Sequence, residues 1–188
     1  MRKINQIVKE LKKGKVIVCP TDTVYGLIAD ATNKKAVEKV FKIKKRPKNK
    51  PLPIFVKDIK MAKKLAKINE EQEKFLKKVW PGKVTVVLKA KSSIKKLKIF
   101  GVDKRTIALR VPNHKLILNL LRKMNKPLTG TSANISGQPA STKIKEILKQ
   151  FKNQKPQPDL IIDAGNLPKS KPSIIVDLTT LPIKILRE

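Results

Sequence analysis

Two spacings of apolar residues alternate along this chain of 188 residues. Apolar residues three and four positions apart are typical of a helix with one buried face, whereas short uninterrupted apolar runs are typical of buried strands. The first spacing predicts helices at 4–11, 36–41, 61–66, 75–79, 116–121 and 142–150, the last of them with Thr142 as its N-cap. The second predicts strands at 16–19, 53–56, 84–88, 106–111, 128–131, 160–162, 174–176 and 183–186.

This irregular alternation of helices and strands favours an α/β domain with a twisted mixed sheet and flanking helices. The length fits a single domain that spans residues 1–188. Residues 152–159 are polar and contain proline, so we expect a surface loop there. The segment 91–104 is rich in lysine and includes Gly101, and it fits either a mobile flap or an ordinary solvated loop.

The formal net charge of +31 comes from 45 basic and 14 acidic residues. A basic face could bind nucleic acid or another polyanion. Alternatively, an AT-rich genome could have filled solvated positions with lysine, and the even spread of lysine along the chain favours this second interpretation. Arginine is scarce, so the positions that keep it are those where its planar fork is needed.

Several classes of protein do not fit the sequence. No apolar run approaches the roughly 18–20 residues of a membrane span. The N-terminal residues lack the apolar core of a signal peptide, and a single cysteine, Cys19, gives no disulfide framework. We therefore expect a cytoplasmic protein with no membrane contact and Cys19 packed in the core.

Familiar catalytic patterns are also missing. The chain has no Walker loop, no G-x-G-x-x-G and no nucleophile elbow. Its only histidine, His114, suits a surface or capping role better than catalysis, and the one tight carboxylate group, Glu70 with Glu71 and Glu73, lies at a predicted helix start. The sequence predicts no paired-carboxylate hydrolase and no metal site made by protein side chains.

Three polar segments at the ends of predicted elements are the candidates for chemistry: residues 21–25, 44–52 and 130–139. Each has an ordinary structural explanation as a strand-end turn, a basic helix C-terminus or an Asx/Ser turn. Considered together, one basic segment and two hydroxyl-rich strand ends predict a site for a polyanion and a small polar ligand.

The order of these segments resembles the YrdC/Sua5 family of threonylcarbamoyl-AMP synthases. The matching motifs are P-T-D-T-V-Y-G-L at 20–27, K-x-R-P at 44–47, R-x-P at 110–112, S-A-N-x-S-G-x-P at 132–139 and P-S-x-I-V-D at 172–177. The resemblance extends from Gly14 to Asp177, and the chain is similar to the short YrdC type without the C-terminal Sua5 domain. It implies a YrdC-like fold with a concave basic cavity.

The resemblance also implies a reaction. Members of the family combine L-threonine, bicarbonate and ATP, with Mg²⁺ accompanying the ATP, into threonylcarbamoyl-adenylate and pyrophosphate. A separate threonylcarbamoyl transferase complex then modifies adenosine 37 of tRNAs that read ANN codons. Because the substrate itself supplies the nucleophile, the protein needs only to position the reactants and to stabilise charge on phosphoryl oxygens.

The roles of individual residues follow from the same resemblance. Lys44 and Arg46 are implied as the catalytic phosphate clamp, and both are expected at the mouth of the site. Two positions depart from Sua5-like members: Phe55 stands where some carry a histidine near threonine, and Ala140 where a serine often contacts nucleotide. The implied threonine-binding residues are Thr23, Arg110 and Ser173, and the implied ATP-binding residues are Arg46, Lys50, Thr106, Ser132, Asn134 and Arg187.

Two alternatives stay open. One is a non-enzymatic RNA-binding or tRNA-binding protein of the same fold, and the other is a carbamoyl-transfer relative. The chain has seven aromatic residues and no aromatic cluster for stacking bases, so any RNA contact would be weak, electrostatic and sensitive to salt. The presence of all four motif residues favours the synthase; they are Lys44, Arg46, Ser132 and Asn134.

Overall fold

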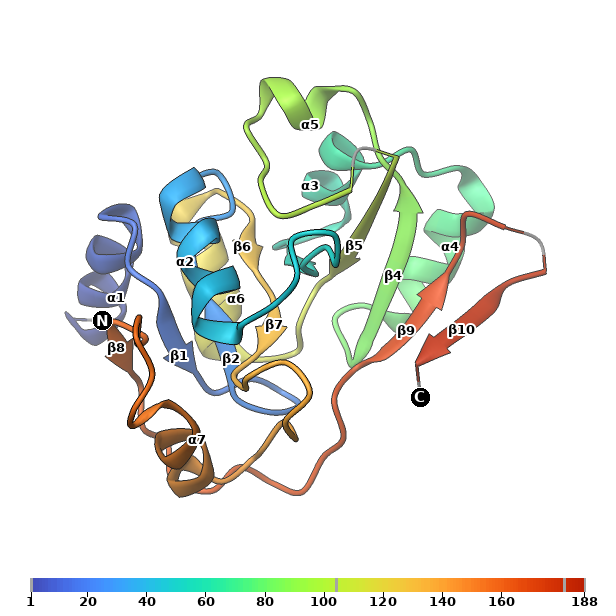
Figure 1. Cartoon of the computed structure of the whole chain (residues 1–188). Helices are drawn as coiled ribbons and strands as arrows, with labels where there is room; N and C mark the ends of the chain where they lie inside the picture. Colours follow the sequence, from blue (N-terminus) through green and yellow to red (C-terminus); the bar gives the residue numbers. More distant parts are fainter. Residues whose placement is uncertain (1, 104, 181, 188) are drawn as a thin grey trace.

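Two mixed β-sheets lie side by side with helices packed around them, as Figure 1 shows for the computed structural model. The structure describes residues 2–103, 105–180 and 182–187. The predicted α/β fold with mixed strand directions and flanking helices is confirmed, but the strands form two sheets and not one. Because β-pairing is a contact between distant segments, apolar periodicity along the chain does not reveal this division.

The smaller sheet has four strands and is covered on both faces. Its order is β7–β2–β1–β8, with β1 antiparallel to β2 and parallel to β8. Alternate side chains of β1 point to opposite faces, so Ile17 and Cys19 pack against α1 and α6 while Val18 packs against α2 and α7. The elements are β1 (Ile17–Cys19), β2 (Gly26–Ile28), β7 (Thr131–Ser132), β8 (Leu160–Ile161), α1 (Arg2–Lys12), α2 (Lys34–Lys44), α6 (Lys115–Met124) and α7 (Ile144–Phe151).

The larger sheet has six strands, in the order β10–β9–β4–β5–β3–β6. Val86, Leu88 and Leu109 face α3, α4 and α5 in a single apolar cluster. The period of two then turns Ala108 and Arg110 to the opposite face, which these three helices leave uncovered. The elements are β3 (Ile54–Phe55), β4 (Val84–Lys89), β5 (Thr106–Arg110), β6 (Leu128–Thr129), β9 (Ile174–Asp177), β10 (Lys184–Arg187), α3 (Ile59–Leu65), α4 (Glu70–Val79) and α5 (Ser93–Lys96).

Most predicted elements are confirmed, and the differences have local causes. The strand predicted at 128–131 is broken at Gly130, where the chain leaves β6 of the larger sheet and enters β7 of the smaller one. Thr142 is not the N-cap of α7: the N-cap is Lys143, and the Ser141 hydroxyl accepts a hydrogen bond from its backbone N–H. Strand β2 and helix α5 were not predicted, because each is too short to show a period.

The remaining structural predictions concern loops and isolated residues. The described part of segment 91–104 carries the buried residues Ile94 and Ile99, so it packs on the core; residue 104 lies outside the described residues. The loop at 152–159 is at the surface, as predicted. Cys19 is fully buried in the core, and this burial raises the pKa of its thiol to about 12.

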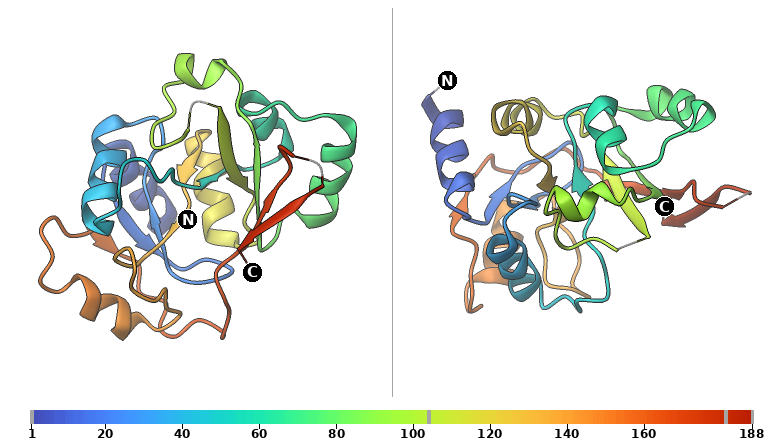
Figure 2. Two further views of the ribbon diagram at one scale, coloured as in Figure 1. Left: turned by 45° about the vertical axis from the view of Figure 1, so that its right-hand side comes forward. Right: turned by 90° about the horizontal axis from the view of Figure 1, so that it is seen from above.

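Figure 2 shows that strands β9 and β10 project from the edge of the larger sheet. Strand β10 pairs with β9 alone, and all four of its residues are exposed. No helix in the described part of the chain has the length and apolar character needed to cross a membrane.

Candidate active site

A cavity of about 360 Å³ lies between the two sheets, where the uncovered face of the larger sheet meets the strand ends of the smaller one. All three polar segments identified in the sequence reach it. Eight of the nine residues implied as threonine- or ATP-binding line it, and so does Lys44. Among the described residues, the lining includes no carboxylate and five basic side chains: Lys44, Arg46, Lys50, Arg110 and Arg187.

The turn after β1 forms one wall of the cavity and holds itself in place through its own side chains. The Thr21 hydroxyl donates to the carbonyl of Val24 at 2.6 Å and accepts from the backbone N–H of Thr23 at 3.1 Å. A hydroxyl has one proton, so the 3.1 Å contact between the two threonine hydroxyls has Thr23 as its donor. The Thr23 oxygen is then left as an acceptor that faces Arg110. The turn therefore satisfies its own backbone groups, as an ordinary strand-end turn does, and still leaves a hydroxyl oxygen available in the cavity.

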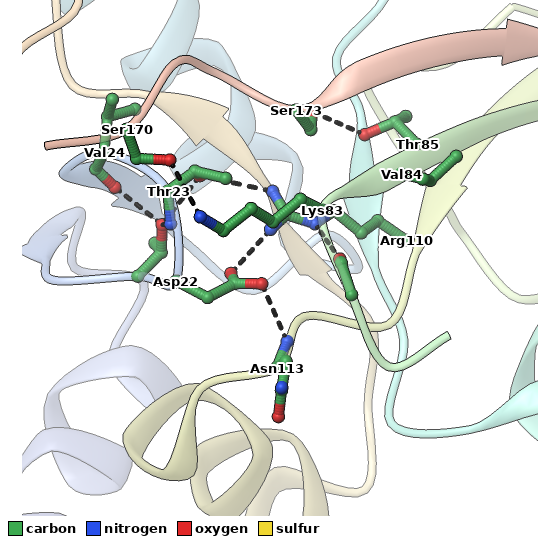
Figure 3. A network of polar contacts seen from close by, with 12 residues as sticks. Asp22, Thr23, Val24, Lys83, Val84, Thr85, Arg110, Asn113, Ser170 and Ser173 are labelled. Atoms are coloured by element: carbon green, nitrogen blue, oxygen red, sulfur yellow. Dashed lines mark hydrogen bonds and ion pairs between the residues drawn. The ribbon is translucent and has the colours of Figure 1, made fainter. Parts of the chain in front are cut away.

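Arg110 ends strand β5 and is almost completely buried, with 3 % of its surface exposed. Figure 3 shows its guanidinium at the centre of a polar network. It donates from Nε to the Gly82 carbonyl at 2.8 Å, from Nη2 to Asp22 at 2.6 Å, and from Nη1 to the Thr23 hydroxyl at 3.4 Å. Burial lowers the pKa of Arg110, and the charge of Asp22 opposes that effect.

Among the described residues, three of the five N–H groups of Arg110 thus have partners, which leaves one N–H on each terminal nitrogen. Two N–H groups of one guanidinium can bind the two oxygens of a carboxylate. Asp22, whose second oxygen accepts from the backbone N–H of Asn113 at 3.0 Å, fixes the guanidinium from the other side.

Lys44, at the C-terminus of α2, is buried and does not lie at the mouth of the site as predicted. Its ammonium donates to the carbonyls of Ser132 and Asn134 at 2.5 and 2.9 Å, and to the Asn134 side-chain oxygen at 3.0 Å. These bonds use all three ammonium protons. Lys44 therefore fixes the loop after β7.

Burial, together with repulsion from Arg46, lowers the pKa of Lys44 to about 7. The Asn134 side chain is also committed to the loop, because its amide nitrogen donates to the Ile135 and Gln138 carbonyls at 3.0 and 2.6 Å. Ser132 donates its hydroxyl proton to Asn134 at 2.6 Å and keeps its lone pairs. Hence the motif S-x-N forms a rigid wall that presents backbone and hydroxyl groups.

Arg46 also lines the cavity, and its side chain is partly exposed. Its Nε and Nη2 donate to the carbonyls of Lys50 and Pro51, both at 2.9 Å. These two bonds fix the orientation of the guanidinium and leave three N–H groups for a ligand. Burial and the neighbouring charge of Arg187 lower the pKa of Arg46, yet a guanidinium stays protonated at neutral pH.

Ser173, just before β9, and Arg187, at the end of β10, contact each other in the cavity wall. Arg187 donates to the Ser173 carbonyl from Nε at 3.1 Å and from Nη2 at 2.6 Å, and to the Ser173 hydroxyl at 3.2 Å. The same hydroxyl lies 2.9 Å from that of Thr85. A residue implied for threonine and one implied for ATP are thus in direct contact, so the two subsites share a wall.

Two positions from the sequence analysis lie outside the lining. Thr106 begins β5, four residues before Arg110, and it lines a separate pocket together with Lys67, Lys89 and Arg105. Because a strand rises ~6.7 Å for every two residues, Thr106 is about 13 Å from Arg110 along the strand. Ala140 does not line the cavity either.

Some features of the site were not predicted. The role of Asp22 as the partner of Arg110 was missed, because the two residues are 88 positions apart in the sequence. His114 occupies the N-cap position of α6, but its side chain makes no capping bond. In the described residues, no group of three histidine, cysteine or carboxylate side chains could hold a metal ion.

The fold and the cavity define a class of protein: an α/β domain of two sheets with a small cavity lined by basic side chains. The family model for Sua5, YciO and YrdC proteins, described as "Telomere recombination", matches residues 9–188. The chain belongs to this family.

Curated relatives cover most of the chain. A putative threonylcarbamoyl-AMP synthase of Methanocaldococcus jannaschii is 41% identical over 96% of this chain and 82% of its own length. The threonylcarbamoyl-AMP synthase of Pyrococcus abyssi is 36% identical over 94% of this chain. The chain spans about half of that longer protein, 51% of its length.

Solved structures agree with the fold. The structure of P. abyssi Sua5 in complex with L-threonine superposes with a TM-score of 0.87 at 35% identity, covering 98% of this chain and 53% of that one. Escherichia coli YciO superposes with a TM-score of 0.87 at 29% identity over 100% of this chain and 89% of its own. The YrdC-like fold expected from the motifs is therefore confirmed.

Proposed function

We propose that this protein is a threonylcarbamoyl-AMP synthase, which forms threonylcarbamoyl-adenylate and pyrophosphate from L-threonine, bicarbonate and ATP. The observation that carries the proposal is the pairing of two kinds of recognition in one cavity. A buried arginine with two free N–H groups suits the carboxylate of an amino acid, and four further basic residues suit a polyphosphate. The names of the curated relatives support the same reaction.

In this proposal, Arg110 holds the threonine carboxylate, while Thr23 and Ser173 bound the same subsite. The threonine amine adds to the carbon of bicarbonate with loss of water, which gives a carbamate. A carbamate oxygen then attacks the α-phosphorus of ATP, and the bond to the bridging oxygen of the β-phosphate breaks, so that pyrophosphate leaves. The protein supplies no nucleophile and acts by positioning and by stabilising phosphoryl charge.

The basic residues take the nucleotide. Arg46 and Arg187, each with N–H groups to spare, lie where they stabilise the charge that develops on the phosphate oxygens, and Lys50 lies beside them. Ser132 offers a hydroxyl oxygen, and Lys44 and Asn134 support it from behind. Thr106, farther along β5, is left as a contact for the distal part of an extended ligand.

Mg²⁺ would reach this site with the ATP. The described residues that line the cavity include no carboxylate, so they do not fit a cation by themselves. The phosphate oxygens and water would be its ligands, which is the usual way that Mg²⁺ is held with nucleotides.

The product of this reaction is a reactive mixed anhydride, so a second enzyme must consume it. We assign that role to a threonylcarbamoyl transferase that modifies tRNA, which places the reaction in the cytoplasm. Direct binding of RNA to this chain would be weak and electrostatic.

The test is pyrophosphate release by the purified protein with ATP, L-threonine and bicarbonate. Omitting threonine or bicarbonate should each abolish release. Release of inorganic phosphate, or of pyrophosphate without threonine, would refute the proposal. Salt-sensitive RNA binding with no turnover of ATP would favour the non-enzymatic alternative.

A further inference from the structure

Phe55 lies beside Arg110, and the Arg110 Cζ atom lies over the face of the Phe55 ring. The distance from the Arg110 Cζ atom to the centre of the ring is 5.6 Å, which is within the range of a cation–π contact. Phe55 ends strand β3, is 2 % exposed, and lines the cavity with its ring. Its backbone pairs with Arg110 in the parallel register of β3 and β5. The two residues are therefore held together through both backbone and side chain.

The ring completes the restraint of Arg110. Hydrogen bonds to Gly82, Asp22 and Thr23 fix the guanidinium within its own plane. The Phe55 ring, over which Cζ lies, limits movement of the guanidinium in a further direction, toward strand β3. A carboxylate bound by two parallel N–H groups needs the plane to be correct, because both bonds lie in it.

Gly130 holds the ring from another direction. A Cβ atom at residue 130 would lie 2.5, 2.6 and 2.9 Å from three carbon atoms of the Phe55 ring. Carbon atoms at van der Waals contact are about 3.5–4.0 Å apart, so any side chain here would displace the ring. The backbone of Gly130 is not in the left-handed region, so its own conformation does not require glycine. The ring is the reason for glycine at this position.

We propose that Phe55 and Gly130 are paired positioning residues for the amino-acid substrate, acting through Arg110. Gly130 allows the ring to lie close to the chain, and the ring holds the Arg110 guanidinium in the position that a substrate carboxylate requires. This inference rests on the proposed function, because it takes threonine as the ligand of Arg110.

The first test compares Phe55→Leu with Phe151→Leu by calorimetric titration with L-threonine. Both phenylalanines are 2 % exposed, but Phe151 lies on α7 and does not line the cavity. Losing the ring face should weaken threonine binding about 10-fold in the first variant, from the usual strength of a desolvated cation–π contact. Phe151→Leu should leave threonine binding within about 2-fold, and both variants should melt at similarly lowered temperatures.

A nonhydrolysable ATP analogue provides the second readout. Its affinity should change less than about 2-fold in both variants, because the nucleotide contacts do not pass through the ring. Equal weakening of threonine and nucleotide binding by Phe55→Leu would overturn the proposal, since a general loss of structure would explain it.

The coupling of the two residues is tested by Gly130→Ala alone and in the Phe55→Leu background. Alone, Gly130→Ala should weaken threonine binding about as much as Phe55→Leu, because its methyl group pushes the ring away. In the double variant it should add little, because the ring is already gone. Additive losses would show that the two residues act separately, and they would overturn the pairing.

Failure of this inference is distinguishable from failure of the proposed function. If the wild-type protein binds no threonine, the function of the site is wrong. If the wild type binds threonine and Phe55→Leu binds it equally well, only the positioning role is wrong. Should Phe55→Leu fail to fold, the Gly130→Ala variant still tests the same displacement of the ring.

Discussion

Arg110 is the residue whose surroundings define the amino-acid subsite most closely. Its fork serves Gly82, Asp22 and Thr23 and has two N–H groups left. Arg110→Lys keeps the charge but cannot reach all these partners with one ammonium group. We expect the KM for threonine to rise at least ~30-fold and the KM for ATP to change less than about 3-fold, on the scale of losing a charge-assisted hydrogen bond.

Steady-state kinetics with each substrate varied in turn measures this difference. The control is Lys152→Ala, which removes a cation from the exposed loop at 152–159 and should change neither constant. Equal increases in the KM for threonine and the KM for ATP for Arg110→Lys would show that Arg110 is not the residue that binds threonine.

Lys44 and Arg46 belong to one motif, yet the structure predicts different consequences of their loss. Lys44→Met removes three hydrogen bonds from a charged donor and takes from the Asn134 carbonyl its side-chain donor, so we expect the free energy of unfolding to fall by about 2–4 kcal/mol. Arg46→Ala removes a half-buried side chain at the edge of the cavity and should lower it by less than about 1 kcal/mol while reducing turnover ~100-fold or more.

Urea unfolding of both variants and of the wild type gives the two free energies. A loss of stability for Arg46→Ala as large as that for Lys44→Met would contradict the division of roles.

The pKa of Lys44, lowered to about 7, makes nucleotide binding depend on pH. At pH 8 a group with this pKa is about 90% neutral, and ATP is fully ionised. A bound triphosphate favours the charged amine and raises its pKa, so binding should take up protons, approaching one per ATP at pH 8. Uptake should fall toward zero below pH 6, where Lys44 is already charged.

Calorimetric titration in buffers with different ionisation enthalpies counts these protons. The comparison is Lys44→Arg, which keeps the charge but does not titrate in this range. Proton release at pH 8, or the same uptake in both proteins, would show that Lys44 is not the titrating group.

At the scale of elements, local patterns were enough to predict every helix except the four-residue α5, and they failed where a strand depends on a distant partner. Helix α4 begins at an Asn69 and Gln72 capping box that is visible in the sequence. Strand β2 is three residues long and is a strand only because β1 and β7 flank it. Similarly, nothing local to Gly130 indicates that the chain changes sheets there.

Strand β10 is the element whose behaviour should report ligand binding. It has one neighbour and four exposed residues, but it carries Arg187 into the cavity. Its backbone amides should exchange hydrogen much faster than those of β4 and β5 in the free protein. A nonhydrolysable ATP analogue should slow this exchange, because Arg187 then connects the strand to a bound ligand.

Hydrogen exchange with mass spectrometry measures this effect for each segment. Strand β8, a short edge strand of the smaller sheet that does not line the cavity, is the internal control. Equal slowing of β8 and β10, or no slowing of β10, would contradict a nucleotide contact at Arg187.

For the whole molecule, composition left an affinity for anions open and gave no position for an anion site. Among the described residues, five basic side chains line the cavity, and many of the other basic residues are exposed lysines. The motifs predicted most of the residues that line the cavity, because each motif contributes a short segment of that lining. The distances between walls could not be predicted, since Lys44 and Ser132 are 88 positions apart and Thr23 and Arg110 are 87 apart.

The central claim is that one cavity joins threonine, a one-carbon unit and the α-phosphate of ATP. The most direct measurement is mass spectrometry of the nucleotide product formed from ¹³C-labelled bicarbonate, ATP and L-threonine. The account predicts an adenylate that contains both threonine and the labelled carbon, formed together with pyrophosphate and absent when either substrate is omitted. An adenylate of threonine without the labelled carbon, or labelled carbon joined to AMP without threonine, would contradict it.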